Sequence, residues 1–149
     1  MDTNNKAPPS AAWLGALGAL PFIGLAGAAP FLESAPRIFV VHALAAYGAT
    51  ILSFLGGVHW GLAIGSRSGA NDPGLRNKLI VSVIPSLAAW VALLFPEKTG
   101  LLILAAAIAV MLWVDIRATR AGHAPQWYPK LRIPLTAVVV AALLLGARA

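Results

Sequence analysis

Charged residues divide the sequence into five long stretches that contain almost none. A helix of roughly 20 apolar residues crosses the hydrocarbon core of a bilayer, which is about 30 Å thick. The stretches therefore predict five membrane-spanning helices, at about residues 11–32, 38–65, 78–96, 99–118 and 131–147. The last two are short, so we expect Lys98, Asp115, Arg132 and Arg148 to reach the membrane interface. The predicted fold is all-α, a polytopic transmembrane helical bundle that forms one integral membrane domain over residues 1–149.

The composition indicates that lipid, rather than water, surrounds most of the chain. Of the 149 residues, 59% are hydrophobic and 11% are charged, whereas a typical soluble domain has about 25% charged residues. The net charge of +6 comes from basic residues that lie between the apolar stretches. Since they do not line one helical face, we expect no binding of nucleic acid. The sequence has no cysteine, which excludes disulfides and thiolate chemistry.

The first stretch has a second interpretation, as a cleaved signal peptide. It has Lys6, an apolar segment from Ala11 to Leu25, and the small residues Ala26-Gly27-Ala28, which resemble a cleavage site. The apolar segment is long for a signal peptide, so we expect the first span to be retained.

The distribution of basic residues predicts the orientation of the bundle. Three of them, Arg37, Lys98 and Arg148, lie on the side opposite the N-terminus. Eight lie on the side of the N-terminus: Lys6, Arg67, Arg76, Lys78, Arg117, Arg120, Lys130 and Arg132. Because cytoplasmic loops carry an excess of Lys and Arg, we expect the N-terminus inside and the C-terminus outside.

Small residues recur at every fourth position of the second span. They are Ala45, Ala49, Ser53, Gly57, Gly61 and Gly65. In lipid, a stripe of small residues lets two helix backbones approach closely. The stripe therefore predicts a packing face. We expect its partner to be a helix of the same chain; the alternative is another membrane protein or a second copy of this one.

The second span also contains the two histidines that lie within predicted membrane segments, His42 and His59, with the hydroxyl group of Tyr47 between them. Ionisable groups at this depth are costly and often functional. A neutral histidine can also simply form a hydrogen bond across a pair of helices. His42 lies near the outer end of its span, close to water, so His59 is the stronger candidate.

The alternative for His59 is a pairing with Asp115, the only carboxylate at the end of a span. The alternating topology places both groups toward the same side of the membrane. Such a carboxylate would fix the imidazole tautomer, and Arg117 or Arg132 could neutralise its remaining charge. The predicted functional polar cluster is therefore His59, Asp115, Arg132 and Tyr47.

We predict no metal, no cofactor and no catalytic residue. Two histidines at one depth are needed for bis-histidine haem binding, whereas His42 and His59 lie far apart on one helix and His123 lies in a loop. Within one chain, a cluster of three or four metal ligands is also missing.

Aromatic residues cluster near the predicted cytoplasmic interface, where tryptophan and tyrosine side chains anchor membrane proteins. The predicted anchors are Trp60, Trp113, Trp127 and Tyr128. The last two belong to the proline-containing segment 121–136, which leads into the fifth span. The alternative for this segment is contact with a partner protein or a lipid headgroup.

Two motifs and one further residue resemble a known family: YGAxILSFLGGVHWG at residues 47–61, WYxxLRxxLT at residues 127–136, and Asp115. They are similar to a family of uncharacterised membrane proteins, with bacterial inner-membrane members and mitochondrial relatives typified by transmembrane protein 69. The resemblance covers the second to fifth spans. It implies a multi-span protein of the bacterial cytoplasmic membrane, or alternatively of the mitochondrial inner membrane, and it implies no particular activity.

Three functions can be weighed against these features. The first is a non-enzymatic accessory or assembly protein that binds membrane partners through the small-residue stripe. The second is a pathway for a small solute or for protons, using His59 and Asp115. The third is a membrane enzyme acting on lipid headgroups or isoprenoids, but the expected acidic metal-binding motif is missing from the sequence. The first agrees best with the sequence.

Overall fold

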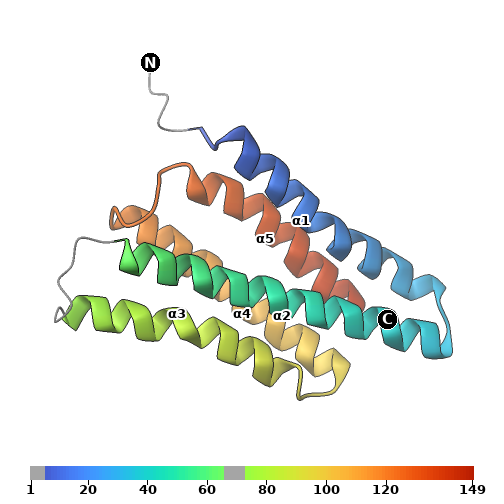
Figure 1. Cartoon of the computed structure of the whole chain (residues 1–149). Helices are drawn as coiled ribbons and strands as arrows, with labels where there is room; N and C mark the ends of the chain where they lie inside the picture. The colour runs from blue at the N-terminus through green and yellow to red at the C-terminus, as the bar shows by residue number, and fades with distance from the viewer. Residues whose placement is uncertain (1–5, 66–72) are drawn as a thin grey trace.

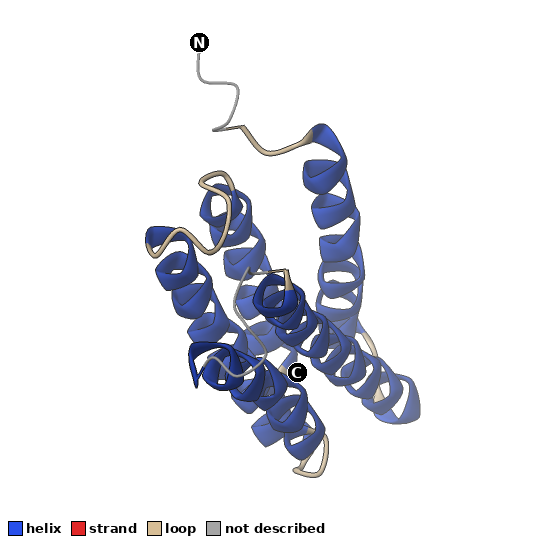
Figure 2. Cartoon of the chain, turned by 60° about the vertical axis from the view of Figure 1, so that its left-hand side comes forward, coloured by secondary structure: helices blue, strands red, loops and turns tan. Residues whose placement is uncertain are grey.

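The computed structural model describes residues 6–65 and 73–149, and every regular element in these ranges is helical (Figures 1 and 2). The elements are α1 (Pro9–Ala28), η2 (Ala29–Phe31), α2 (Ser34–Ile64), α3 (Pro73–Ala92), α4 (Glu97–Arg120) and α5 (Tyr128–Gly146). Five helices are long and apolar enough to cross a membrane. The prediction of an all-α bundle with five spans is confirmed.

The predicted spans differ from the helices mainly at their ends. The helices α2, α3 and α4 each begin before the predicted span and include charged residues such as Arg37, Arg76 and Lys98. Charge marks where an apolar stretch ends, but a helix continues beyond it because Lys, Arg and Glu are good helix formers. Arg67, which contributes to the predicted orientation, lies outside the described residues.

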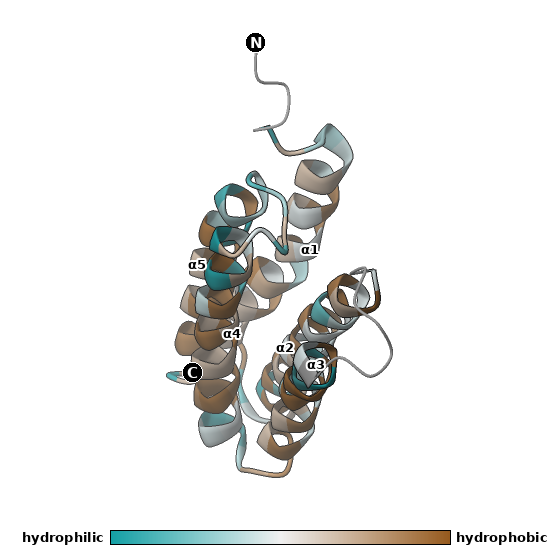
Figure 3. Ribbon diagram, turned by 90° about the vertical axis from the view of Figure 1, so that its left-hand side faces the viewer, coloured by the Kyte–Doolittle hydropathy of each residue, from teal (hydrophilic) through white to brown (hydrophobic). Residues whose placement is uncertain are grey.

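Helix α2 lies at the centre of the bundle and contacts the four other long helices. Its most extensive packing is against α3, while α4 crosses behind α2 and packs mainly against α5, and α1 packs against α5 and α2 (Figures 1 and 3). The helices alternate in direction, so α2 and α4 end where α3 and α5 begin. We call this the basic end, because its described basic residues are Lys6, Arg76, Lys78, Arg117, Arg120, Lys130 and Arg132.

The core between the helices is apolar. Its largest buried side chains are Phe22, Leu44, Leu52, Leu101, Leu104, Ile108 and Leu143, which come from α1, α2, α4 and α5. Large apolar side chains also cover the outside of the bundle, among them Phe39, Phe54 and Trp90, and hydrophobic colour dominates the ribbons in Figure 3. An apolar exterior of this kind is solvated by lipid tails rather than by water.

The small-residue stripe of α2 does not form one packing face, contrary to the prediction that it packs within the chain. Ala45 and Ala49 are buried, but Gly57, Gly61 and Gly65 are exposed. Each step of four residues turns about 40° beyond a full helical turn, so the five steps of the stripe rotate by about 200°. The stripe therefore begins on the core side of α2 and ends on its outer side.

The glycine of α2 that packs most closely is Gly56, one residue from the predicted stripe. A Cβ atom at Gly56 would lie 2.5 Å from the backbone oxygen of Ser82 and 3.4 Å from Cβ of Pro85. Only glycine permits this approach of α2 to α3, which brings the two backbones into contact. At Gly57 and Gly61, by contrast, a Cβ atom would meet nothing within 4 Å.

Candidate functional site

A buried cluster of charged side chains joins three helices near the basic end. Asp115 of α4 is fully buried, and its Oδ1 atom lies 2.7 Å from Nε2 of His59 on α2. Its Oδ2 atom accepts a hydrogen bond of 2.8 Å from Nε of Arg132 on α5. The structure thus brings together three of the four residues of the predicted polar cluster.

The contact with Asp115 selects one tautomer of the neutral His59 ring. A carboxylate only accepts hydrogen bonds, so the proton in the contact with Asp115 belongs to Nε2 of His59. In the neutral ring, Nδ1 is then left as an acceptor. Asp115 and Arg132 compensate each other's charge, which is the condition for keeping either in an apolar interior.

Two threonines that were not in the predicted cluster complete the polar region. Thr119 is buried on α4 and donates a hydrogen bond of 3.1 Å to the backbone oxygen of Asp115. Thr136 is buried on α5, and its hydroxyl group has no partner within the described residues; the same holds for Nη2 of Arg132. Each threonine follows a charged member of the cluster by four residues, the spacing that puts two side chains on one helix face. This four-residue spacing is the feature of the sequence that identifies the two threonines as members of the polar region.

Tyr47 does not belong to the cluster, which corrects the predicted set. Its hydroxyl group donates a hydrogen bond of 3.0 Å to the backbone oxygen of Gly18 on α1, and its ring lies 4.9 Å from that of Phe22. Twelve residues separate it from His59, which is about 18 Å along a helix. Tyr47 therefore attaches α1 to α2. His42 is exposed and likewise lies away from the cluster.

The predicted aromatic anchors lie around the basic end. Trp60 and Trp113 are exposed, and the guanidinium of Arg117 stacks over the Trp113 ring at 4.6 Å. Trp127 and Tyr128 are half-buried and meet edge to face, with ring centroids 6.0 Å apart. Their anchoring role stays a prediction. Within residues 6–65 and 73–149, no three side chains of metal-binding type lie together.

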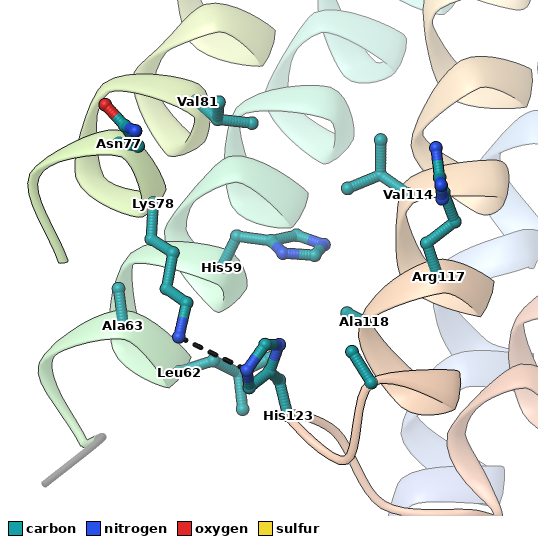
Figure 4. A pocket seen from close by; sticks show the side chains of 11 residues that line it. His59, Leu62, Ala63, Asn77, Lys78, Val81, Val114, Arg117, Ala118 and His123 are labelled. Atoms are coloured by element: carbon teal, nitrogen blue, oxygen red, sulfur yellow. Dashed lines mark hydrogen bonds between the residues drawn. The ribbon is translucent and has the colours of Figure 1, made fainter. Parts of the chain in front are cut away.

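A cleft of about 390 Å³ opens beside the cluster at the basic end, between α2, α3 and α4 (Figure 4). Its polar lining comprises His59, Asn77, Lys78, Arg117 and His123. Nζ of Lys78 lies 3.3 Å from Nε2 of His123, as the dashed line shows. Through His59, the cleft borders the buried pair of Asp115 and Arg132. The sequence does not reveal this cleft, because its walls come from segments far apart in the chain.

Comparison with known proteins places the chain in a family. Transmembrane protein 69 of Xenopus tropicalis is 40% identical over 144 residues, which are 92% of this chain and 53% of that protein. Transmembrane protein 69 of Mus musculus is 32% identical over 127 residues, 78% of this chain and 50% of that protein. The chain thus spans about half the length of these curated relatives. No solved structure matches. The family model described as protein of unknown function (DUF3429) matches residues 7–148, and the chain belongs to that family of multi-span membrane proteins.

Proposed function

We propose that this protein is a non-enzymatic accessory protein that binds a transmembrane helix of a membrane partner through the outer face of α2. The observation that carries the proposal is the exposure of Gly57 and Gly61, one turn apart, with open space where each Cβ atom would lie. In lipid, exposed small residues at this spacing let a second helix approach closely.

The surroundings of these glycines support the same function. Phe54 and Ile64 are exposed on α2 just before and after them, at 66% and 63%. Large apolar side chains on either side of a smooth patch can interlock with the ridges of a second helix. The charge cluster at His59 ties this part of α2 to α4 and α5, so the face is presented on a rigid support.

The proposal is tested by purifying the tagged full chain from native membranes and measuring what co-purifies. The Gly57→Leu/Gly61→Leu double variant should no longer co-purify with a stoichiometric partner, whether that partner is another protein or a second copy of this chain. The matched control is Gly24→Leu/Gly27→Leu on α1, where both positions are also exposed and open. Equal partner recovery from both double variants would refute the proposal.

A second candidate function is a pathway for a small solute or for protons, and the cleft beside His59 favours it. His59 connects this cleft to Asp115 and Arg132. Beyond the cluster, however, Leu52, Leu104 and Ile108 fill the core, so a complete pathway would require these side chains to move. Proton flux into proteoliposomes, measured for wild type and His59→Gln, tests this function; equal flux in both and in empty liposomes would exclude it.

A further inference from the structure

The cleft at the basic end combines cationic groups with apolar walls. Lys78 enters it from α3, Arg117 lines it from α4, and His123 lines it from the loop that follows α4. Figure 4 shows Lys78 extending across the cleft toward His123. Its apolar walls are formed by Leu62, Ala63, Val81, Val114, Ala118 and Ala121.

The positive charge of this cleft is not balanced by the described residues. No Asp or Glu is found among the described lining residues, and within the described part of the chain neither Lys78 nor Arg117 forms an ion pair. Asp115 lies behind His59 but is enclosed, with one oxygen contacting His59 and the other Arg132. The cleft therefore attracts an anion.

The donors in the cleft suit an oxyanion. The contact with His123 engages one hydrogen of the Lys78 ammonium group and leaves two. Arg117 offers a guanidinium fork, which pairs well with phosphate oxygens. Asn77 also lines the cleft. The cleft thus contains an ammonium and a guanidinium group, the two cationic groups that proteins use to bind phosphate.

The apolar walls indicate what carries the phosphate. A soluble phosphate compound is hydrated on all sides and gains little from Leu62, Val81 and Val114. A phospholipid has its phosphate at the membrane surface, with hydrocarbon directly beneath it. Basic pockets between transmembrane helices are recognised sites for anionic lipid headgroups. We propose that this cleft binds the phosphate headgroup of an anionic phospholipid from the leaflet at the basic end, which the predicted orientation makes the cytoplasmic leaflet.

The test measures lipid retention. The full chain is reconstituted in nanodiscs of phosphatidylcholine with phosphatidylglycerol, and lipids that remain bound after detergent extraction are counted by native mass spectrometry. Wild type should retain phosphatidylglycerol in preference to phosphatidylcholine. The Lys78→Gln/Arg117→Gln variant should lower that preference about tenfold, since each basic residue near an anionic surface contributes severalfold.

Two control variants separate binding from folding. Arg120→Gln/Lys98→Gln likewise removes two positive charges. Both residues are exposed on α4 and neither lines the cleft, so this variant should retain the wild-type preference. Lys78→Arg/Arg117→Lys keeps both charges and should also retain most of it. An equal loss in the control pair, or an unchanged preference in Lys78→Gln/Arg117→Gln, would overturn the proposal.

A final arm distinguishes a lipid from a free anion. Inorganic phosphate at millimolar concentration is added before extraction. Retention of phosphatidylglycerol in the presence of added phosphate supports the lipid site. Full displacement of phosphatidylglycerol by phosphate means that the cleft binds a soluble anion, and it refutes the lipid site. The Gly57→Leu/Gly61→Leu variant should bind lipid normally, so this proposal and the proposed function can fail independently.

Discussion

His59 and Asp115 lie 56 residues apart in the sequence, and in the folded chain Nε2 of one is 2.7 Å from Oδ1 of the other. Because Arg132 donates to the second oxygen of Asp115 at 2.8 Å, the carboxylate joins α2, α4 and α5 at a single point. The carboxylate is fully buried. A buried carboxylate that engages both a guanidinium and an imidazole therefore connects three helices, and its removal should lower the stability of the protein.

Replacing Asp115 with Asn should destabilise the protein by about 3–5 kcal/mol, because the buried charge of Arg132 loses its counter-charge. The measurement is the free energy of unfolding in mixed detergent micelles. Glu97→Gln is the control, since Glu97 is an exposed carboxylate on the same helix, and it should change stability little. Similar stabilities for the two variants would contradict the role assigned to Asp115.

The double variant Asp115→Leu/Arg132→Met should be more stable than Asp115→Asn. Removing both charges leaves no uncompensated ion in the interior, and apolar replacement of a buried ion pair is often neutral or stabilising. The same unfolding measurement applies. If the destabilisation of the double variant equalled the sum of those of Asp115→Leu and Arg132→Met, the two side chains would not be acting as a pair.

Gly56→Ala should weaken the packing of α2 on α3, whereas Gly57→Ala should be tolerated. The added methyl group at Gly56 would lie 2.5 Å from the Ser82 backbone oxygen, and at Gly57 it would meet nothing within 4 Å. Overpacking of this kind costs about 1–3 kcal/mol. Thermal unfolding of the two neighbouring variants checks the difference; equal midpoints would show that the helices do not approach as closely as described.

Tyr47→Phe should loosen the attachment of α1 without affecting the charge cluster. It removes the 3.0 Å hydrogen bond to the Gly18 oxygen, at a cost of about 0.5–1.5 kcal/mol. Hydrogen exchange in α1 should become faster. Thr50→Val is the control, because the Thr50 hydroxyl group donates to the backbone oxygen of Ala46 on its own helix. Faster exchange in both variants would argue against a specific role for Tyr47.

The orientation can be tested directly because the sequence has no cysteine. Single cysteines replace Lys6, before α1, and Glu33, between η2 and α2. With the N-terminus inside, a membrane-impermeant maleimide should label Glu33→Cys in intact cells and Lys6→Cys only after permeabilisation. The reverse pattern would invert the predicted topology and would move the lipid site to the outer leaflet.

The sequence alone was enough to predict five spans and to identify His59, Asp115 and Arg132 as the ionisable residues to examine. Both predictions rest on local properties: the length of an uncharged stretch, and the cost of placing an ionisable group within it. Neither depends on how the helices are rotated against one another. The close approach at Gly56 would have required following the 3.6-residue period of the helix rather than every fourth residue.

Only the tertiary structure decided which groups meet. It joined His59 to Asp115, turned Tyr47 toward α1 instead, and left Gly57 and Gly61 on the outside of α2. It also formed the cleft from α2, α3, α4 and the loop that follows α4. These outcomes depend on the rotation and tilt of each helix relative to its neighbours, which are set by the packing of side chains between helices. The spacing of residues within one helix does not determine them.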